Sequence, residues 1–195
     1  MTIKTFNINT DKTAFVRAYL PDSIAGLPFC EKRPAVLIFP GGGYEYCSDR
    51  EGEPIALQYL ALGYAAFVVT YSCNERFPEP LMDAAYIFYK IRMRAEEFKI
   101  DPQKMAVLGC SAGGHLAGCL ATMWSDIALT KTIGCEPEDL RPNAAILCYP
   151  VISGVTAPHE GSFKVLLGED ASRSDLSRLS LENRVTPKTP PVFIL

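Results

Sequence analysis

The sequence has no apolar run of the length that a bilayer-spanning helix needs, about 20 residues. Its opening stretch, MTIKTFNINTDKTAFVRAYLP, alternates polar and apolar residues and lacks the continuous apolar core of a signal peptide. It contains no block of Lys and Arg, and its net charge of −3 does not indicate the basic surface that nucleic-acid binding requires. We therefore expect no membrane and no nucleic-acid partner, and a cytoplasmic location.

Metal-binding patterns are also missing. The chain has two histidines, His115 and His159, and no CxxC or zinc-site spacing of Cys, His and carboxylates. Its seven cysteines are odd in number, and without an export signal we expect them to be free thiols. No metal and no cofactor is predicted.

Short apolar runs alternate with helical patterns along the 195 residues, a length that suits one domain. Continuous short runs favour buried parallel strands, and the first, alternating one favours a half-exposed strand. The runs span 13–21, 35–40, 64–72, 105–110, 144–152 and 191–195, and helices are predicted over 53–63, 79–100 and 111–124. This order predicts a single α/β domain over residues 1–195 with a doubly wound, mostly parallel sheet. Polar residues 153–190 interrupt the rhythm and predict a small cap with short helices.

The stretch GCSAG, residues 109–113, fits G-x-S-x-G between the predicted strand 105–110 and a helix. That context indicates a nucleophile elbow, in which Ser111 is held on a sharp turn above the sheet edge. The amide of Ala112 can then stabilise an oxyanion. The alternative is a tight turn that merely contains a serine.

A second glycine-rich stretch, FPGGGYEYC over 39–47, follows another central strand. Its backbone N–H groups lack side-chain cover, so Gly42 and Gly43 can supply further oxyanion donors. A phosphate cradle is the alternative. However, the loop has neither the G-x-G-x-x-G fingerprint nor the GK[ST] of a P-loop.

Several of these segments together resemble the α/β-hydrolase superfamily: PGGGY, YSCNERFPEP, DAAYIFYKIR, FKIDPQKMAVLGCSAGGHLA and YPVIS. Within it the chain resembles the acetyl-esterase branch of the hormone-sensitive-lipase-like carboxylesterases and, more distantly, kynurenine formamidases. The resemblance runs from about residue 13 to the end. It implies Ser111 as nucleophile, and Gly42, Gly43 and Ala112 as oxyanion donors. Pro40 stands where the lipase-type HGGG loop has a histidine, which argues against lipase activity.

The fold implied by this resemblance places the catalytic acid and histidine after the cap, in the order Ser, acid, His. The sequence stops at Leu195 inside the last predicted strand, so we expect a chain truncated before its C-terminal strand, helix, acid and histidine. His115 lies along the helix that Ser111 opens, so we predict a packing role for it. His159 precedes the last strand and is predicted to border the pocket.

The resulting hypothesis is a serine hydrolase of short-chain carboxylic esters, with acetylated sugars among its small-molecule substrates. A formamidase or peptidase on the same fold, and a non-catalytic binding module, are the alternatives. An exposed sheet edge also favours pairing into a homo-oligomer.

Overall fold

The structure is a computed structural model that describes residues 1–7, 14–23 and 32–195. The described residues form a seven-stranded sheet in the order β1-β2-β4-β3-β5-β6-β7. The strands are β1 Thr2–Asn7, β2 Phe15–Leu20, β3 Arg33–Phe39, β4 Ala65–Thr70, β5 Ile100–Cys110, β6 Ala144–Cys148 and β7 Val192–Ile194. β2 runs antiparallel to both β1 and β4, whereas the neighbours from β4 to β7 are parallel. The predicted mostly parallel sheet is confirmed.

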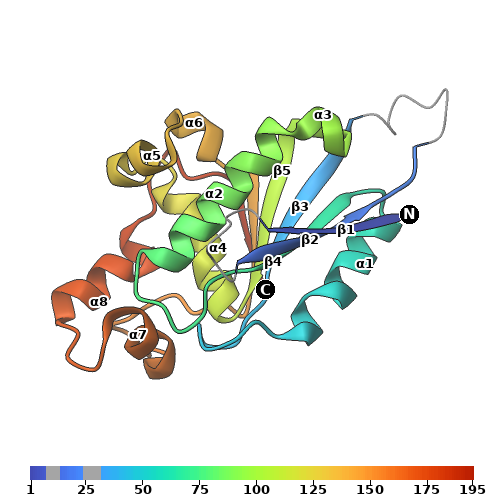
Figure 1. Cartoon of the computed structure of the whole chain (residues 1–195). Helices are drawn as coiled ribbons and strands as arrows, with labels where there is room; N and C mark the ends of the chain where they lie inside the picture. Colours follow the sequence, from blue (N-terminus) through green and yellow to red (C-terminus); the bar gives the residue numbers. More distant parts are fainter. Residues whose placement is uncertain (8–13, 24–31) are drawn as a thin grey trace.

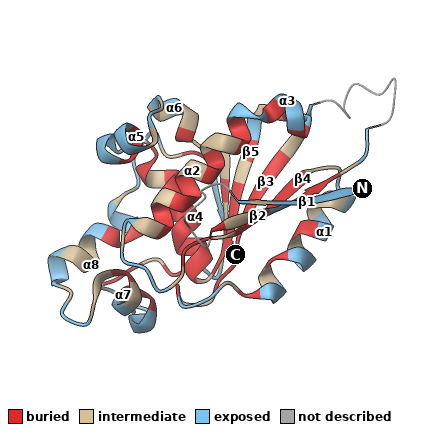
Figure 2. Ribbon diagram, viewed as in Figure 1, coloured by how far each residue is buried: buried red, intermediate tan, exposed pale blue. Residues whose placement is uncertain are grey.

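Helices cover both faces of this sheet, with α1 on one face and α2 and α4 on the other (Figure 1). The helices are α1 Glu53–Ala61, α2 Glu79–Met93, α3 Ala95–Phe98, α4 Ala112–Met123, α5 Ile127–Ile133, α6 Pro137–Leu140, α7 Glu160–Leu167 and α8 Arg173–Leu179, with 3-10 turns η2 Asp49–Glu51 and η3 Leu181–Asn183. Figure 2 shows buried residues concentrated along β3, β5, α2 and α4. The doubly wound arrangement is therefore as predicted.

Strand β3 shows why the central runs are continuously apolar. Ala35, Leu37 and Phe39 lie in the core under α2 and α4, while Val36 and Ile38 lie in the smaller core under α1. Successive side chains of a strand point to opposite faces, so a strand covered on both faces needs apolar residues at every position. Each large side chain buried in this way contributes about 1.5–3 kcal/mol.

Two predicted boundaries near Lys99 are wrong. The helix predicted over 79–100 ends at Met93; the short α3 follows, and Lys99 turns the chain at a φ of 54°. Strand β5 then begins at Ile100, five residues earlier than the run 105–110 suggests. The polar residues at its start hide it from a search for apolar runs.

The strand predicted over 144–152 ends at Cys148. Tyr149 has a φ of 36°, which no strand residue adopts, and Pro150 has no N–H to continue a ladder. The predicted strand 13–21 corresponds to β2, and residue 13 lies outside the described residues. Strand β1 and the short helices α5 and α6 were not predicted, because they are short and give no extended periodicity.

Residues 153–190 contain α7, α8 and η3 and connect β6 to β7. The segment packs on the core through Leu181, which lies against α4 at Gly118. Strand β7 pairs with β6 at the edge of the sheet, and all three of its residues are exposed. Among the described helices, none combines the length and apolarity that crossing a membrane would demand.

Candidate active site

Ser111 occupies a strand–turn–helix junction, as predicted. Strand β5 ends at Cys110, α4 begins at Ala112, and Ser111 between them has φ 52° and ψ −117°. Its amide donates to the carbonyl oxygen of Cys148 at 3.0 Å, and its carbonyl accepts from the amide of Val151 at 3.0 Å. A non-glycine residue at such a φ is strained, and strain of this kind concentrates at functional sites. The turn and the segment after β6 thus fix the serine at the carboxyl edge of the sheet.

The two glycines of the GCSAG stretch are required by close backbone contacts. A Cβ on Gly109 would lie 2.0 Å from the carbonyl oxygen of Gly113. A Cβ on Gly113 would lie 2.0 Å from the carbonyl oxygen of Phe39. Real Cβ atoms do not approach backbone this closely, so the tight packing of α4 against β5 and β3 depends on both glycines.

The glycine loop, residues 41–43, lies directly beside this turn. A Cβ on Gly41 would lie 3.0 Å from Cβ of Ser111. Gly42 and Gly43 have φ values of 130° and 66°, which only glycine adopts readily. The two glycine-rich stretches, about 70 residues apart in the sequence, are therefore neighbours in space.

The backbone amides around Ser111 differ in whether they have an acceptor. The Gly41 amide donates to Oε2 of Glu51 at 2.7 Å. In the part of the chain that the structure describes, the amides of Gly42 and Gly43 have no acceptor. Ala112 is the first residue of α4, so its amide has no partner within the helix. The three amides that the sequence nominated thus include two loop amides without an acceptor among the described residues and one at the start of α4.

Glu51 is a residue of this site that sequence reasoning missed. Its second oxygen, Oε1, accepts from the hydroxyl of Tyr149 at 2.9 Å. One carboxylate therefore joins the glycine loop to the segment after β6, on either side of Ser111. Its position in the stretch DREGEP carried no motif that could have identified it.

His115 is buried, and both of its ring nitrogens are engaged, in line with the predicted packing role. Nε2 is 2.8 Å from the carbonyl oxygen of Leu179, so it must carry the proton and donate. Nδ1, at 2.7 Å from the Tyr44 oxygen, accepts from that hydroxyl. Burial lowers the pKa of His115 to about 4, which keeps the ring neutral.

His159 lies over the pocket next to Ser111, as predicted. Its Nδ1 lies 2.9 Å from Oγ of Ser162 and accepts from the amide of the same residue at 3.3 Å, as the N-cap of α7. In a neutral ring Nε2 must then hold the proton. A catalytic base for a serine needs the opposite tautomer, with Nδ1–H held by a carboxylate and Nε2 free to accept. In the described residues, the Ser111 hydroxyl has no hydrogen bond to either histidine.

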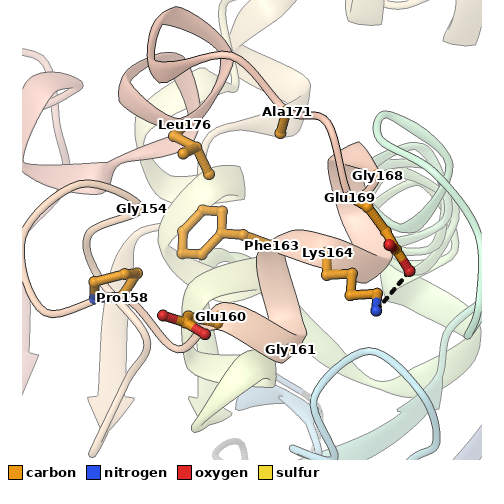
Figure 3. A pocket seen from close by; sticks show the side chains of 10 residues that line it. All are labelled: Gly154, Pro158, Glu160, Gly161, Phe163, Lys164, Gly168, Glu169, Ala171 and Leu176. Carbon is orange, nitrogen blue, oxygen red and sulfur yellow. Dashed lines mark ion pairs between the residues drawn. The ribbon is translucent and has the colours of Figure 1, made fainter.

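Two neighbouring cavities open around His159. The first, of about 610 Å³, is lined by Ser111, Tyr149, Ser153, His159 and Glu182 among others. The second, of about 560 Å³, is lined by Pro158 and Glu160, the residues on either side of His159, and by residues of the 153–190 segment. Figure 3 shows Phe163 and Leu176 facing one another across it, with the ion pair of Lys164 and Glu169 at one side. His159 therefore lines the first cavity together with Ser111, and its two neighbours in the chain line the second.

Two more titratable side chains are buried. Cys110 lies in the smaller core under α1, and burial raises its pKa to about 12. The Asp83 carboxylate accepts from the amide of Ser72 at 2.9 Å. Within the described residues, no group of three or more His, Cys, Asp or Glu side chains could hold a metal ion.

A family model named BD-FAE matches residues 27–195. The chain belongs to the BD-FAE family. Among solved structures, it is 38% identical over its whole length to MGS-M1, an alpha/beta hydrolase enzyme from a Medee basin deep-sea metagenome library, with a TM-score of 0.72 and 67% of that chain covered. The resemblance to α/β-hydrolases is thereby confirmed.

Relatives with named activities are longer than this chain. It is 36% identical over 84% of its length to "Endo-1,4-beta-xylanase B" of Butyrivibrio fibrisolvens, and 31% identical over 98% of its length to "Acetylxylan esterase" of Xylanibacter ruminicola. It spans 26% and 37% of those proteins. The acetyl ester-xyloside bifunctional hydrolase of Caldicellulosiruptor lactoaceticus matches 97% of the chain at 35% identity and a TM-score of 0.81, with 68% of that structure covered.

Proposed function

We propose that this BD-FAE chain carries the nucleophile and oxyanion hole of a serine carboxylesterase that removes short acyl groups, acetyl groups on xylan-type sugars among them. The observation that supports this most is the strained Ser111 beside the amides of Gly42, Gly43 and Ala112. The relatives named acetylxylan esterase and acetyl ester-xyloside hydrolase support the substrate class.

In the proposed reaction Oγ of Ser111 attacks the carbonyl carbon of the ester. The carbonyl oxygen becomes negatively charged and accepts hydrogen bonds from Gly42, Gly43 and Ala112. The proton that Ser111 gives up passes to the departing sugar oxygen, and water then hydrolyses the acyl-serine, which releases the carboxylic acid and restores the Ser111 hydroxyl. A single backbone donor of this kind contributes about 10²–10³ in rate.

The serine also needs a base. His115 and His159 both use Nδ1 as an acceptor, so neither offers an accepting Nε2 to Ser111. We therefore place the base and its orienting carboxylate in the part of the longer relatives that this chain does not span. We assign the remaining donor of His159, Nε2–H, to the acyl-acceptor side of the substrate, since His159 and Ser111 line the same cavity.

The second cavity is the proposed site for the sugar, since it has both apolar and charged walls. Acetate release from acetylated xylo-oligosaccharides, compared with nitrophenyl esters of increasing acyl length, tests this assignment. In a catalytically complete form, His159→Ala should raise KM for the acetylated oligosaccharide several-fold and change kcat little. If His159→Ala instead lowers kcat on nitrophenyl acetate as much as on the acetylated oligosaccharide, His159 takes part in the chemical step.

A further inference from the structure

We propose that Cys47 and Cys73 form a dithiol site that small disulfides, such as oxidised glutathione, convert into a Cys47–Cys73 disulfide. The two Sγ atoms lie 3.8 Å apart although the residues are 26 positions apart in the chain. Six of the seven cysteines are described, and all six are free thiols; Cys30 lies outside the described residues.

The backbone around this pair is already held in place. The Asn74 amide donates to the carbonyl oxygen of Tyr44 at 2.8 Å, and its side-chain Nδ2 donates to the carbonyl oxygen of Glu45 at 2.8 Å. A disulfide bond is about 2.05 Å long, so the sulfurs need to approach by less than about 2 Å. Rotation about the two χ1 angles can supply such a movement without separating the glycine loop from the segment after β4.

The environment of the pair also distinguishes its two members. Both side chains are half-buried, whereas Cys110 and Cys119 are buried and out of reach of a reagent. The hydrogen bond from Cys47 lowers the pKa of Cys73. The pKa of Cys47 is raised well above its ordinary value, mainly by the same hydrogen bond and also by burial. Cys73 is thus the better nucleophile, and Cys47 is placed to resolve the intermediate.

The reaction is two successive thiol–disulfide exchanges. The Cys73 thiolate attacks one sulfur of oxidised glutathione, forms a mixed disulfide and releases one glutathione thiolate. The Cys47 thiolate then attacks the Cys73 sulfur and releases the second glutathione. The two protein thiols are oxidised, the small disulfide is reduced, and the two thiol protons end on the two glutathione molecules.

The product would tie the residues that follow the glycine loop to the end of the neighbouring parallel strand. It closes a loop that contains η2, α1 and β4. Such a cross-link restricts the unfolded chain, so the oxidised protein should melt roughly 5 °C above the reduced one. This effect does not depend on esterase activity.

Peptide mapping after treatment with oxidised glutathione tests the proposal directly. Free thiols are blocked with iodoacetamide before trypsin digestion. Residues 33–50 and 51–76 are two adjacent tryptic peptides, and each contains one cysteine, Cys47 or Cys73. We expect these peptides to be joined, at a mass two hydrogen atoms below their sum, and to separate after dithiothreitol.

Single variants provide the controls. Cys47→Ser should leave a stable glutathione adduct on Cys73 and lose the rise in Tm. Cys135→Ser, which removes a half-buried thiol elsewhere, should leave both the joined peptides and the rise in Tm unchanged. The proposal fails if Cys47 and Cys73 are both found alkylated by iodoacetamide, which shows that neither was oxidised. It also fails if each cysteine carries glutathione but the two peptides are not joined, or if the joined peptides form with no increase in Tm.

Discussion

The Tyr44 hydroxyl donates a hydrogen bond to Nδ1 of His115 at 2.7 Å, and both side chains are buried. The same imidazole donates from Nε2 to the carbonyl oxygen of Leu179. Tyr44 follows the glycine loop, His115 lies in the helix that begins after Ser111, and Leu179 ends α8. One neutral ring thus joins the three segments that surround the proposed active site.

Replacing Tyr44 by Phe should destabilise the protein, because buried Nδ1 of His115 loses the hydroxyl donor and keeps only the weak contact with Sγ of Cys119 at 3.8 Å. An unsatisfied buried acceptor costs about 1–3 kcal/mol. Urea unfolding measures the effect. Tyr46→Phe, two residues on and exposed, should change the free energy of unfolding by less than about 0.5 kcal/mol. Equal effects of the two variants would contradict the role assigned to the Tyr44–His115 bond.

Acid should weaken the fold through His115. Its pKa is lowered to about 4 in the folded chain, against an ordinary value of 6.5. The neutral ring therefore contributes stability that is fully present above pH 6.5 and is lost as the pH falls toward 4, since the unfolded chain takes up the proton first. The loss is on the order of 3 kcal/mol.

The comparison with His115→Gln isolates this contribution from the carboxylates and from nearby Glu182 and Cys119. The difference in unfolding free energy between the wild-type protein and the variant should shrink from pH 7 to pH 4. A difference that stays constant over this range would show that His115 does not titrate as inferred.

Gly113→Ala should lower the free energy of unfolding by about 3 kcal/mol or prevent folding. The new Cβ would clash with the backbone of Phe39, and this backbone cannot move without separating α4 from the sheet. Gly134→Ala serves as the comparison. It has a φ of 77° but nothing within 4 Å of the added Cβ, so only the backbone cost of about 1 kcal/mol remains. Thermal unfolding ranks the two, and a milder effect at Gly113 would refute the steric argument.

Glu51→Gln should reduce esterase activity in a catalytically complete form about tenfold, less than the loss of an oxyanion donor itself. The Gly41 amide and the Tyr149 hydroxyl are both donors, and the glutamine amide offers only one accepting oxygen. The loss should appear in kcat rather than KM. Glu53→Gln, whose carboxylate accepts from Tyr19 away from Ser111, is the matched control and should retain full activity.

Much of the sheet was predictable, because each central strand is a short apolar run with helices on both sides. The position of Ser111 was also predictable, since GCSAG joins a strand to a helix and its glycines meet backbone on both sides. Strand β5 was predicted too short because Asp101, Pro102, Gln103 and Lys104 interrupt its apolar pattern while it still lies beside β3. An apolar pattern in the sequence marks only the buried part of a strand, so the partly exposed start of β5 gives no such pattern.

The supporting parts of the site were not predictable. Glu51, Tyr44 and Tyr149 act through contacts with segments distant in the sequence, and no local pattern marks such partners. The tautomers of His115 and His159 likewise follow from their hydrogen-bond partners in the fold. Spacing along the chain could suggest that neither histidine is the base, but only the geometry gives the chemical reason.

The rate of nitrophenyl acetate hydrolysis tests the central claim most directly. It should be measured for the 195-residue chain and for the chain joined to the C-terminal part of a longer relative that it does not span, each with and without Ser111→Ala. We expect the short chain to be slow, with only the residual catalysis of an oxyanion hole, and the extended chain to be faster by about 10³-fold. Ser111→Ala should abolish that gain. The account is contradicted if the short chain already matches the extended one and loses its activity with Ser111→Ala, or if the extended chain keeps its rate without the Ser111 hydroxyl.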